Sequence, residues 1–326
     1  MADKCGSYGR TGKSNVVRGV PLMAGEPSVR LLTAGDVREI AGRIGVRPTK
    51  RLGQNFVIEQ GSVRQIAGLA APEPGDVVLE VGPGLGSLTL ALLDAGATRM
   101  LAVEIDPVLA RELPATLARR APALADRVDV VAADALRLRR ESGILPAAPT
   151  VLAANLPYNV AVPVVLHLLA EYPSIQRGIV MVQAEVADRM CAPPGSRVYG
   201  VPSAKLAWFA AAKSAGTVPR SVFWPVPNVD SKLVAFTRRD PPELAQAVGR
   251  EQVFGVIDAA FGQRRKTLRA ALAGWAGSAA LAERVLRTAG VDPRARGESL
   301  DVAGFISIAE AAASARASAD ADAPAP

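Results

Sequence analysis

The residues best suited to chemistry are four in a row, Asn155-Leu156-Pro157-Tyr158. The exocyclic amine of adenine is a weak nucleophile, because its lone pair is delocalised into the ring. The Asn155 side-chain oxygen and a backbone carbonyl at Leu156 or Pro157 can accept the two amine hydrogens, which frees that lone pair. Tyr158 offers a flat face for a base taken out of its stack, worth about 1–3 kcal/mol. The motif therefore predicts methyl transfer to an adenine amine.

A glycine-rich turn containing Gly82 and Gly84 predicts the site of the methyl donor. Some 20 residues further on, Glu104 can accept hydrogen bonds from the ribose hydroxyls of a nucleoside cofactor. The spacing is G-x-G-x-G, and Ser87 stands where a dinucleotide fingerprint has its third glycine. Glu80 would repel a pyrophosphate but suits the ammonium group of a methionine moiety. The pattern favours S-adenosylmethionine over a nicotinamide cofactor.

Two further residues follow predicted strands or turns. Asp134 comes after a third predicted strand and can accept a hydrogen bond from the adenine amino group of the cofactor. Phe223 lies in a proline-stiffened loop and is a candidate to clamp the second face of the target base. Each residue alone has a structural explanation, such as a capping Asn155 or a packed aromatic ring. The glycine turn, Glu104, Asp134 and Asn155 all fall at the carboxyl ends of strands, where open α/β sheets bind ligands, which indicates one site.

The elements that must position these residues alternate between strand and helix. Strands are predicted at residues 76–81, 100–103, 128–132, 150–154 and 178–183, with two more at 205–212 and 231–237. Such alternation is typical of right-handed βαβ units around a parallel sheet. Only helical patterns follow, at residues 253–261, 266–275, 279–289 and 302–313. The predicted fold is α/β, a Rossmann-like class I methyltransferase sheet with a small C-terminal all-helical domain.

The predicted organisation has four parts. Residues 1–27 and 314–326 have no periodic apolar pattern and are expected to be disordered tails. Residues 28–240 form the catalytic domain, and residues 241–313 form the helical domain after a proline-marked linker.

Charge and composition narrow the classes of partner. The net charge is +7, and 31 of the 38 basic residues are Arg. Arg binds phosphate in bidentate fashion, which favours a polyanionic partner, although coding bias explains the same numbers. Two Cys and one His give neither a disulfide framework nor a metal site. No apolar run reaches the roughly 20 residues that span a bilayer. The lack of a disulfide framework favours a reducing cytoplasm, and we expect the protein to act as a monomer.

Seven segments together resemble the ribosomal RNA adenine dimethyltransferases, in particular the group that acts on the small ribosomal subunit. The segments are residues 52–56 (LGQNF), 79–89 (LEVGPGLGSLT), 103–107 (VEIDP), 133–134 (AD), 155–159 (NLPYN), 222–234 (VFWPVPNVDSKLV) and 260–272 (AFGQRRKTLRAAL). The resemblance implies cofactor contacts at Asn55, Val57, Gly82, Glu104, Asp134 and Asn155. It also implies a substrate of two adjacent adenines near the 3′ end of 16S rRNA, in a pre-assembled small subunit.

Four basic residues are candidates to contact that RNA. Arg264, Arg265, Lys266 and Arg269 are expected at helical spacing in the second domain, where they can grip phosphates. A solvated basic face is the alternative.

Three other functions fit part of the pattern. A large-subunit rRNA methyltransferase that confers antibiotic resistance shares the Asn155–Tyr158 motif. A ribosome assembly factor would use the same fold, with methylation incidental. DNA adenine methyltransferases favour Asp or Ser and a second Pro in the tetrapeptide, whereas this chain has Asn155 and Leu156.

Overall fold

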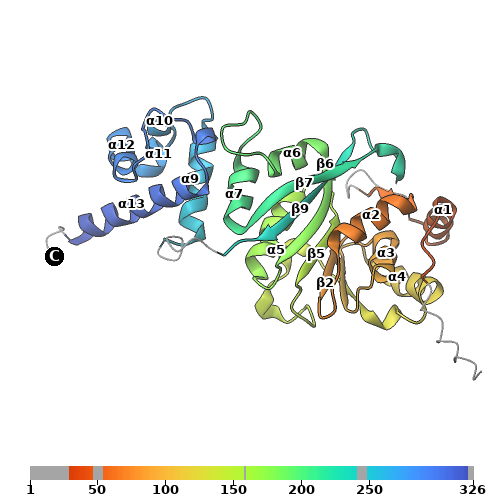
Figure 1. Ribbon diagram of the computed structural model, residues 1–326. Coiled ribbons are helices and arrows are strands. Elements are labelled where there is room, and N and C mark those ends of the chain that lie inside the picture. The colour runs from red at the N-terminus through yellow and green to blue at the C-terminus, as the bar shows by residue number, and fades with distance from the viewer. Residues whose placement is uncertain (1–28, 47–53, 158, 241–247, 322–326) are drawn as a thin grey trace, which may run out of the picture.

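The computed structural model describes residues 29–46, 54–157, 159–240 and 248–321 (Figure 1). Its centre is a seven-stranded sheet in the order β4-β3-β2-β5-β6-β9-β7. The strands are β2 (Val78–Val81), β3 (Met100–Glu104), β4 (Val128–Ala132), β5 (Val151–Asn155), β6 (Arg177–Gln183), β7 (Ala210–Val218) and β9 (Ser231–Arg238). The first five in that order run parallel, and β9 and β7 add antiparallel pairs. This is the predicted Rossmann-like sheet.

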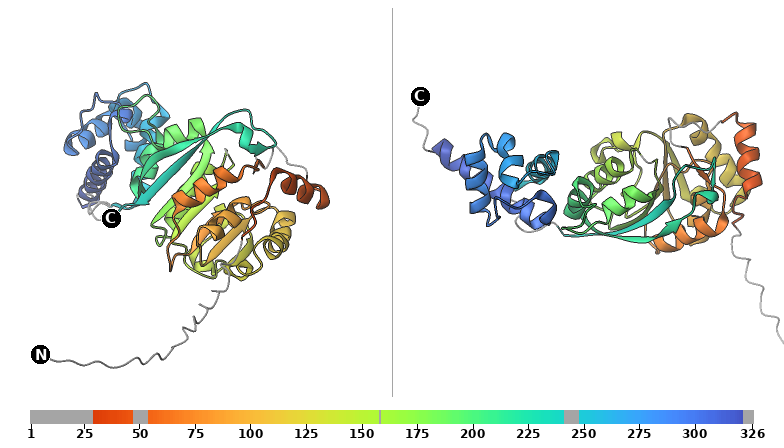
Figure 2. Two further views of the ribbon diagram at one scale, coloured as in Figure 1. Left: turned by 45° about the vertical axis from the view of Figure 1, so that its right-hand side comes forward. Right: turned by 90° about the horizontal axis from the view of Figure 1, so that it is seen from above.

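Helices cover both faces of the sheet (Figures 1 and 2). The helices of this part are α1 (Ala34–Arg43), α2 (Gln60–Ala70), α3 (Ser87–Asp94), α4 (Pro107–Arg120), α5 (Ala161–Glu171), α6 (Ala184–Met190) and α7 (Val201–Phe209). Successive residues of β2 point to opposite faces of the sheet and belong to two different hydrophobic cores. Val78 packs in the core formed with α2, α3 and α4, and Leu79 packs in the core formed with α5. Burial on both faces explains why the central parallel strands are mostly apolar, whereas the edge strand β4 is only partly buried and contains Asp129.

A second sheet has only two short strands. Strand β1 (Phe56–Val57) pairs antiparallel with β8 (Phe223–Trp224), so segments more than 160 residues apart lie side by side. The Phe56 and Trp224 rings stack with centroids 6.3 Å apart.

The prediction of a strand at residues 205–212 is wrong. Helix α7 runs through Phe209, and strand β7 begins only at Ala210. Buried side chains occur around much of α7, because it packs against α5, α6 and the helical domain, so its sequence lacks the usual amphipathic period. Strand β7 is built from small and polar residues, and its pairing with β9 holds it in place.

The C-terminal part contains only helices among its described residues, from residue 248 to residue 321. They are α9 (Arg250–Gly262), α10 (Leu268–Ala271), α11 (Ala273–Ala276), α12 (Ala279–Thr288) and α13 (Val302–Ala321). In this part, as in the other described ranges, no helix is both long and apolar enough to cross a membrane.

Two expectations for this part need correction. The single helix expected at residues 266–275 begins only at Leu268 and is divided at Leu272 into α10 and α11. At its start, the N–H groups of Leu268 and Arg269 bond to the carbonyls of Ala295 and Pro293. The tail expected to be disordered from residue 314 continues as helix to Ala321, consistent with its alanine content. Residues 1–27 and 322–326 lie outside the described residues.

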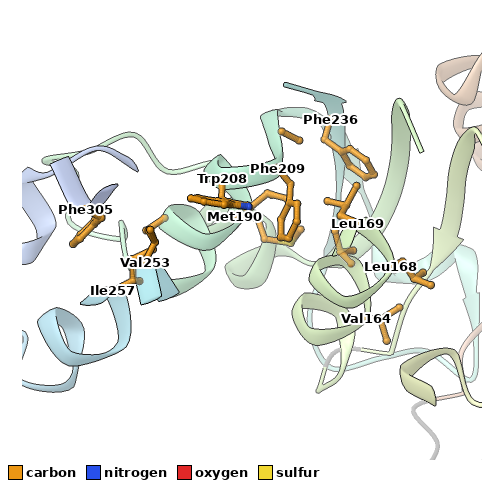
Figure 3. Packing of buried hydrophobic residues seen from close by; sticks show 14 of the residues in the cluster. Val164, Leu168, Leu169, Met190, Trp208, Phe209, Phe236, Val253, Ile257 and Phe305 are labelled. Carbon is orange, nitrogen blue, oxygen red and sulfur yellow. The ribbon is translucent and has the colours of Figure 1, made fainter. Parts of the chain in front are cut away.

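An aromatic and aliphatic cluster joins the helical part to the sheet (Figure 3). The Tyr199 ring meets Phe261 edge-on with centroids 5.8 Å apart, and Phe261 lies 6.0 Å from Phe305 of α13. Trp208 of α7 likewise packs against Phe254 of α9 at 6.2 Å. The two parts therefore share one continuous hydrophobic core.

Replacing Phe305 by Ala should test this shared core. Its side chain is fully buried, so truncation should lower the free energy of unfolding by about 3–5 kcal/mol, measured by chemical denaturation. Leu281→Ala, on α12 with 36% of the residue exposed, is the control and should cost much less. Equal losses in the two variants would contradict the packing described.

Candidate active site

A cavity of about 250 Å³ lies at the carboxyl ends of β2, β3, β4 and β5. Strand register brings its walls together. The Gly82 N–H, directly after β2, donates to the Val103 carbonyl of β3 at 2.9 Å. On the other side, Val81 pairs with Ala154 of β5, so Gly82 is next to Asn155. The glycine turn and the Asn-Leu-Pro corner therefore share one cavity.

Glycine is required in the turn for a steric reason. Gly84 has φ +59°, and a Cβ there would lie 3.0 Å from Cε1 of the Phe56 ring. Gly82 has φ +71°, and a Cβ there would lie 3.8 Å from the Asn155 carbonyl oxygen. Side chains in this left-handed region would strain the backbone and narrow the cavity.

The Asn-Leu-Pro corner is held from three sides. The Asn155 Nδ2 donates to the Asn55 carbonyl at 3.1 Å, which leaves the side-chain oxygen free to accept. The Leu156 N–H donates to the Met181 carbonyl at 3.0 Å, and the Pro157 carbonyl accepts from the Val160 N–H at 3.2 Å. Asn155, Leu156 and Pro157 all line the cavity. Tyr158 lies outside the described residues.

Glu104 is the acid at the end of β3, and its carboxylate is fixed by backbone donors. The Gly84 N–H donates to Oε2 at 3.0 Å, and the Asp106 N–H donates to Oε1 at 2.9 Å. Burial raises the pKa of Glu104, and these two N–H groups oppose that rise. A carboxylate has about four lone-pair positions, so Glu104 can still accept from ribose hydroxyls in the cavity.

Glu80 is the more unusual acid, because it is 1% exposed and its Oε2 has no hydrogen-bond partner among the described residues. Burial raises the pKa of Glu80 to about 8, and the nearby Glu104 adds to the rise. The Thr89 side chain opposes it, although the Thr89 hydroxyl does not reach good hydrogen-bond geometry. An unpartnered buried oxygen lining the cavity fits a positively charged group there.

The remaining predicted cofactor residues also line this cavity. Asp134 caps the short helix η3 (Ala135–Arg137) by accepting from the Leu136 N–H at 2.9 Å. Asn55 contributes its carbonyl, as described. Val57 also lines the cavity, and its carbonyl accepts from the Ser87 hydroxyl at 2.8 Å. Ser87 therefore has a role in holding β1.

Phe223 lines the cavity from β8, but it is 1% exposed and belongs to a strand, not to the open loop expected. It forms part of the wall behind the corner.

Two cavity residues were missed from the sequence. Gln54 donates from Nε2 to Asp106 Oδ2 at 3.0 Å and so ties the start of β1 to the cap of α4. Ile105 is 57% exposed although it is aliphatic, and it faces the cavity. Ile105 could have been found from the sequence, because it is an apolar residue between two acids, Glu104 and Asp106, at the end of a predicted strand.

The four basic candidates lie apart from this cavity and not on one helix. Arg264, Arg265 and Lys266 are in the turn after α9, and only Arg269 is helical, in α10. Arg264 is paired with Glu298 at 3.1 Å and Arg269 with Glu283 at 2.7 Å. The expected helical spacing is therefore wrong, because α9 ends at Gly262.

The sheet, the glycine turn and the two buried acids define a class I S-adenosylmethionine-dependent methyltransferase. The residues present fit that cofactor, since they offer Glu80 for a cationic group, Glu104 for ribose hydroxyls and a turn without side chains. Residues 46–314 match the family described as ribosomal RNA adenine dimethylase. The chain belongs to this family.

Curated relatives and solved structures agree with that assignment. The chain is 61% identical to the Kineococcus radiotolerans ribosomal RNA small subunit methyltransferase A over 279 residues, covering 86% of this chain and 91% of the relative. It is 62% identical to the Streptomyces coelicolor protein of the same name, with 86% and 96% covered.

Among solved structures, a Plasmodium falciparum dimethyladenosine transferase shares the fold, with a TM-score of 0.65 and 23% identity over 78% of this chain and 95% of that one. The 23S rRNA methyltransferase ErmE has a TM-score of 0.58 and 26% identity over 79% and 100%.

Glu80 should make the stability of the protein depend on pH. Because its folded pKa of about 8 lies above the ordinary 4.5, its contribution is fully present below about pH 4.5 and is lost as pH rises towards 8. Glu80→Gln cannot ionise, so the variant should gain stability relative to the native protein between pH 5 and 8, measured by urea denaturation across that range. Glu185→Gln, an exposed acid on α6, controls for the loss of one charge. A difference that does not change with pH would contradict a neutral buried Glu80.

Proposed function

We propose that this enzyme dimethylates the exocyclic amines of two adjacent adenines near the 3′ end of 16S rRNA, within the small ribosomal subunit, during late subunit biogenesis. The observation that carries the proposal is the Asn155-Leu156-Pro157 corner facing the Gly82 turn in one cavity. The small-subunit substrate is supported by relatives near 60% identity that are named for the small subunit. We further propose that it acts as a cytoplasmic monomer.

The chain contributes alignment and hydrogen bonds to the reaction. S-adenosylmethionine, when bound, supplies a methyl group that needs no further activation. The Asn155 side-chain nitrogen donates a hydrogen bond to the Asn55 carbonyl, so the Asn155 side-chain oxygen can accept one hydrogen of the adenine amine. The Leu156 carbonyl is the better second acceptor, since the Pro157 carbonyl already accepts from Val160. These two acceptors would hold the amine with its lone pair directed at the methyl group that the cofactor would supply. Transfer would break the carbon–sulfur bond, leave a neutral thioether, and release one amine proton to water.

The alternatives have less support. The 23S rRNA methyltransferase ErmE is 26% identical to this chain, against about 60% for the small-subunit relatives. An assembly role is compatible with catalysis and needs no separate site.

We assign residues 28–240 to catalysis and residues 241–313 to RNA binding. Arg265 and Lys266 are exposed and form no ion pair with any residue of the described ranges. Their turn lies beside the loop at Pro293 and Ala295, because Leu268 and Arg269 bond to it. That loop adds the exposed Arg294 and Arg296, so two segments form one basic surface that can neutralise phosphates.

Purified protein with labelled cofactor should methylate unmodified small subunits and not large subunits. Asn155→Ala removes a positioned acceptor and should lower the rate by about 10²-fold or more. Asn155→Asp keeps an acceptor oxygen but loses the donor to the Asn55 carbonyl, so its activity should lie between those of the native protein and the Ala variant. Label found only in large-subunit rRNA would refute the proposed substrate, and full activity of Asn155→Ala would remove that residue from the mechanism.

Charge removal at the turn should weaken RNA binding in a salt-dependent way. Arg265→Ala with Lys266→Ala removes two phosphate contacts, so the slope of log affinity against log salt should become shallower by about 1.5–2. Binding of small subunits is measured from 50 to 300 mM salt. Arg189→Ala, in an ion pair on α6, is the control and should leave the slope unchanged. If the slope of log affinity against log salt did not change in the double variant, Arg265 and Lys266 would not contact phosphates.

A further inference from the structure

Val226 is the most exposed of the large hydrophobic side chains in the described residues, at 61%. It stands between Pro225 and Pro227, three residues after Phe223. Phe223 lines the cavity, and three residues of extended chain span at most about 11 Å. An aliphatic side chain is thus presented to solvent within about 11 Å of a residue of the cavity wall.

The loop that carries Val226 is held firmly at both ends. At its start, Phe223 and Trp224 pair with β1, and the Ile58 N–H donates to the Val222 carbonyl at 2.8 Å. At its end, Asp230 accepts from the Arg220 N–H at 3.0 Å and, through its carbonyl, from the Ala184 N–H at 3.0 Å.

The middle of the loop is also restrained. The Arg220 guanidinium donates to the Asn228 carbonyl at 3.3 Å. Pro225 and Pro227 fix two backbone φ angles on either side of Val226. An exposed apolar residue on a stiff loop cannot fold back to bury itself, so it remains available to a partner.

We propose that Val226 is a substrate-positioning residue that packs against the nucleotide next to the target adenine and occupies the space the flipped base leaves. The proposal rests on the function proposed above. Extraction of a base exposes the apolar faces of its neighbours, and proteins that distort nucleic acids commonly fill such a gap with an aliphatic side chain. The stiff loop makes the contact available without a cost in ordering the chain.

Single-turnover methylation of small subunits, with enzyme and cofactor saturating, tests this role. Val226→Ala and the isosteric polar variant Val226→Thr should both lower the rate about tenfold, whereas Val226→Ile should stay within about twofold of the native protein. Cofactor affinity and the thermal midpoint should not change in any of them. Leu69→Ala is the matched control, because Leu69 is 42% exposed but lies far from the cavity. It is two residues before Ala71, whose carbonyl accepts from Arg177 at the amino end of β6, whereas the cavity is at the carboxyl ends of the strands.

Small subunits reconstituted with an abasic nucleotide beside the target adenines provide the second measurement. A base that is already unstacked needs no support, so the Ala variant should approach the native rate on this substrate. Native-like rates of Val226→Ala on ordinary subunits, or a loss confined to subunit binding or to cofactor affinity, would overturn the inference. If the native protein failed to methylate small subunits, the proposed function would fall first, and this inference with it.

Discussion

The site depends on one constraint: the glycine turn after β2 and the Asn155-Leu156-Pro157 corner after β5 must lie next to each other at the carboxyl ends of the strands. Gly82 follows β2, with β3 on one side and β5 on the other, so register alone sets Glu104 and Asn155 beside it. Gly82 has φ +71°, so any residue with a side chain would strain the backbone there, in van der Waals contact with the Asn155 carbonyl. The methyl donor and the target amine can meet only because these strands are parallel and adjacent.

The two buried acids at these strand ends, Glu104 and Glu80, differ in how their charge is compensated. Glu104 is surrounded by backbone N–H groups, which compensate part of the cost of burying its charge. Glu80, one strand inward, has no such donors, and burial holds its pKa near 8. A cation entering the cavity would favour the ionised form of Glu80, whereas an anion would not. The buried and unpartnered Glu80 therefore suits a positively charged cofactor better than an anionic one.

Much of this arrangement could be predicted from the sequence, because parallel strands carry strong local signals. The glycine turn, Glu104 and Asn155 all follow continuous apolar runs, and their common edge follows from the βαβ rule. Helix α7 could not be predicted in this way, since burial on several sides removed its amphipathic period and left a pattern like that of a strand. The turn at Arg264–Lys266 was misread for another reason: Leu268 and Arg269, which follow it, bond to the carbonyls of Ala295 and Pro293 in a distant loop, which no local pattern reports.

The shared core between the sheet and the helical part has a mechanical consequence. Tyr199, Phe261 and Phe305 form a chain of ring contacts, and the Gly195 N–H donates to the Glu298 carbonyl across the same junction at 2.7 Å. Packed cores deform little, so RNA held on the helical part would have a fixed distance and direction to the cavity. On the proposed function, selection of the target adenines would depend on where the RNA is held, because the proposed corner would contact only an amine and a flat base. The junction would then contribute to the choice of site as much as the catalytic residues do.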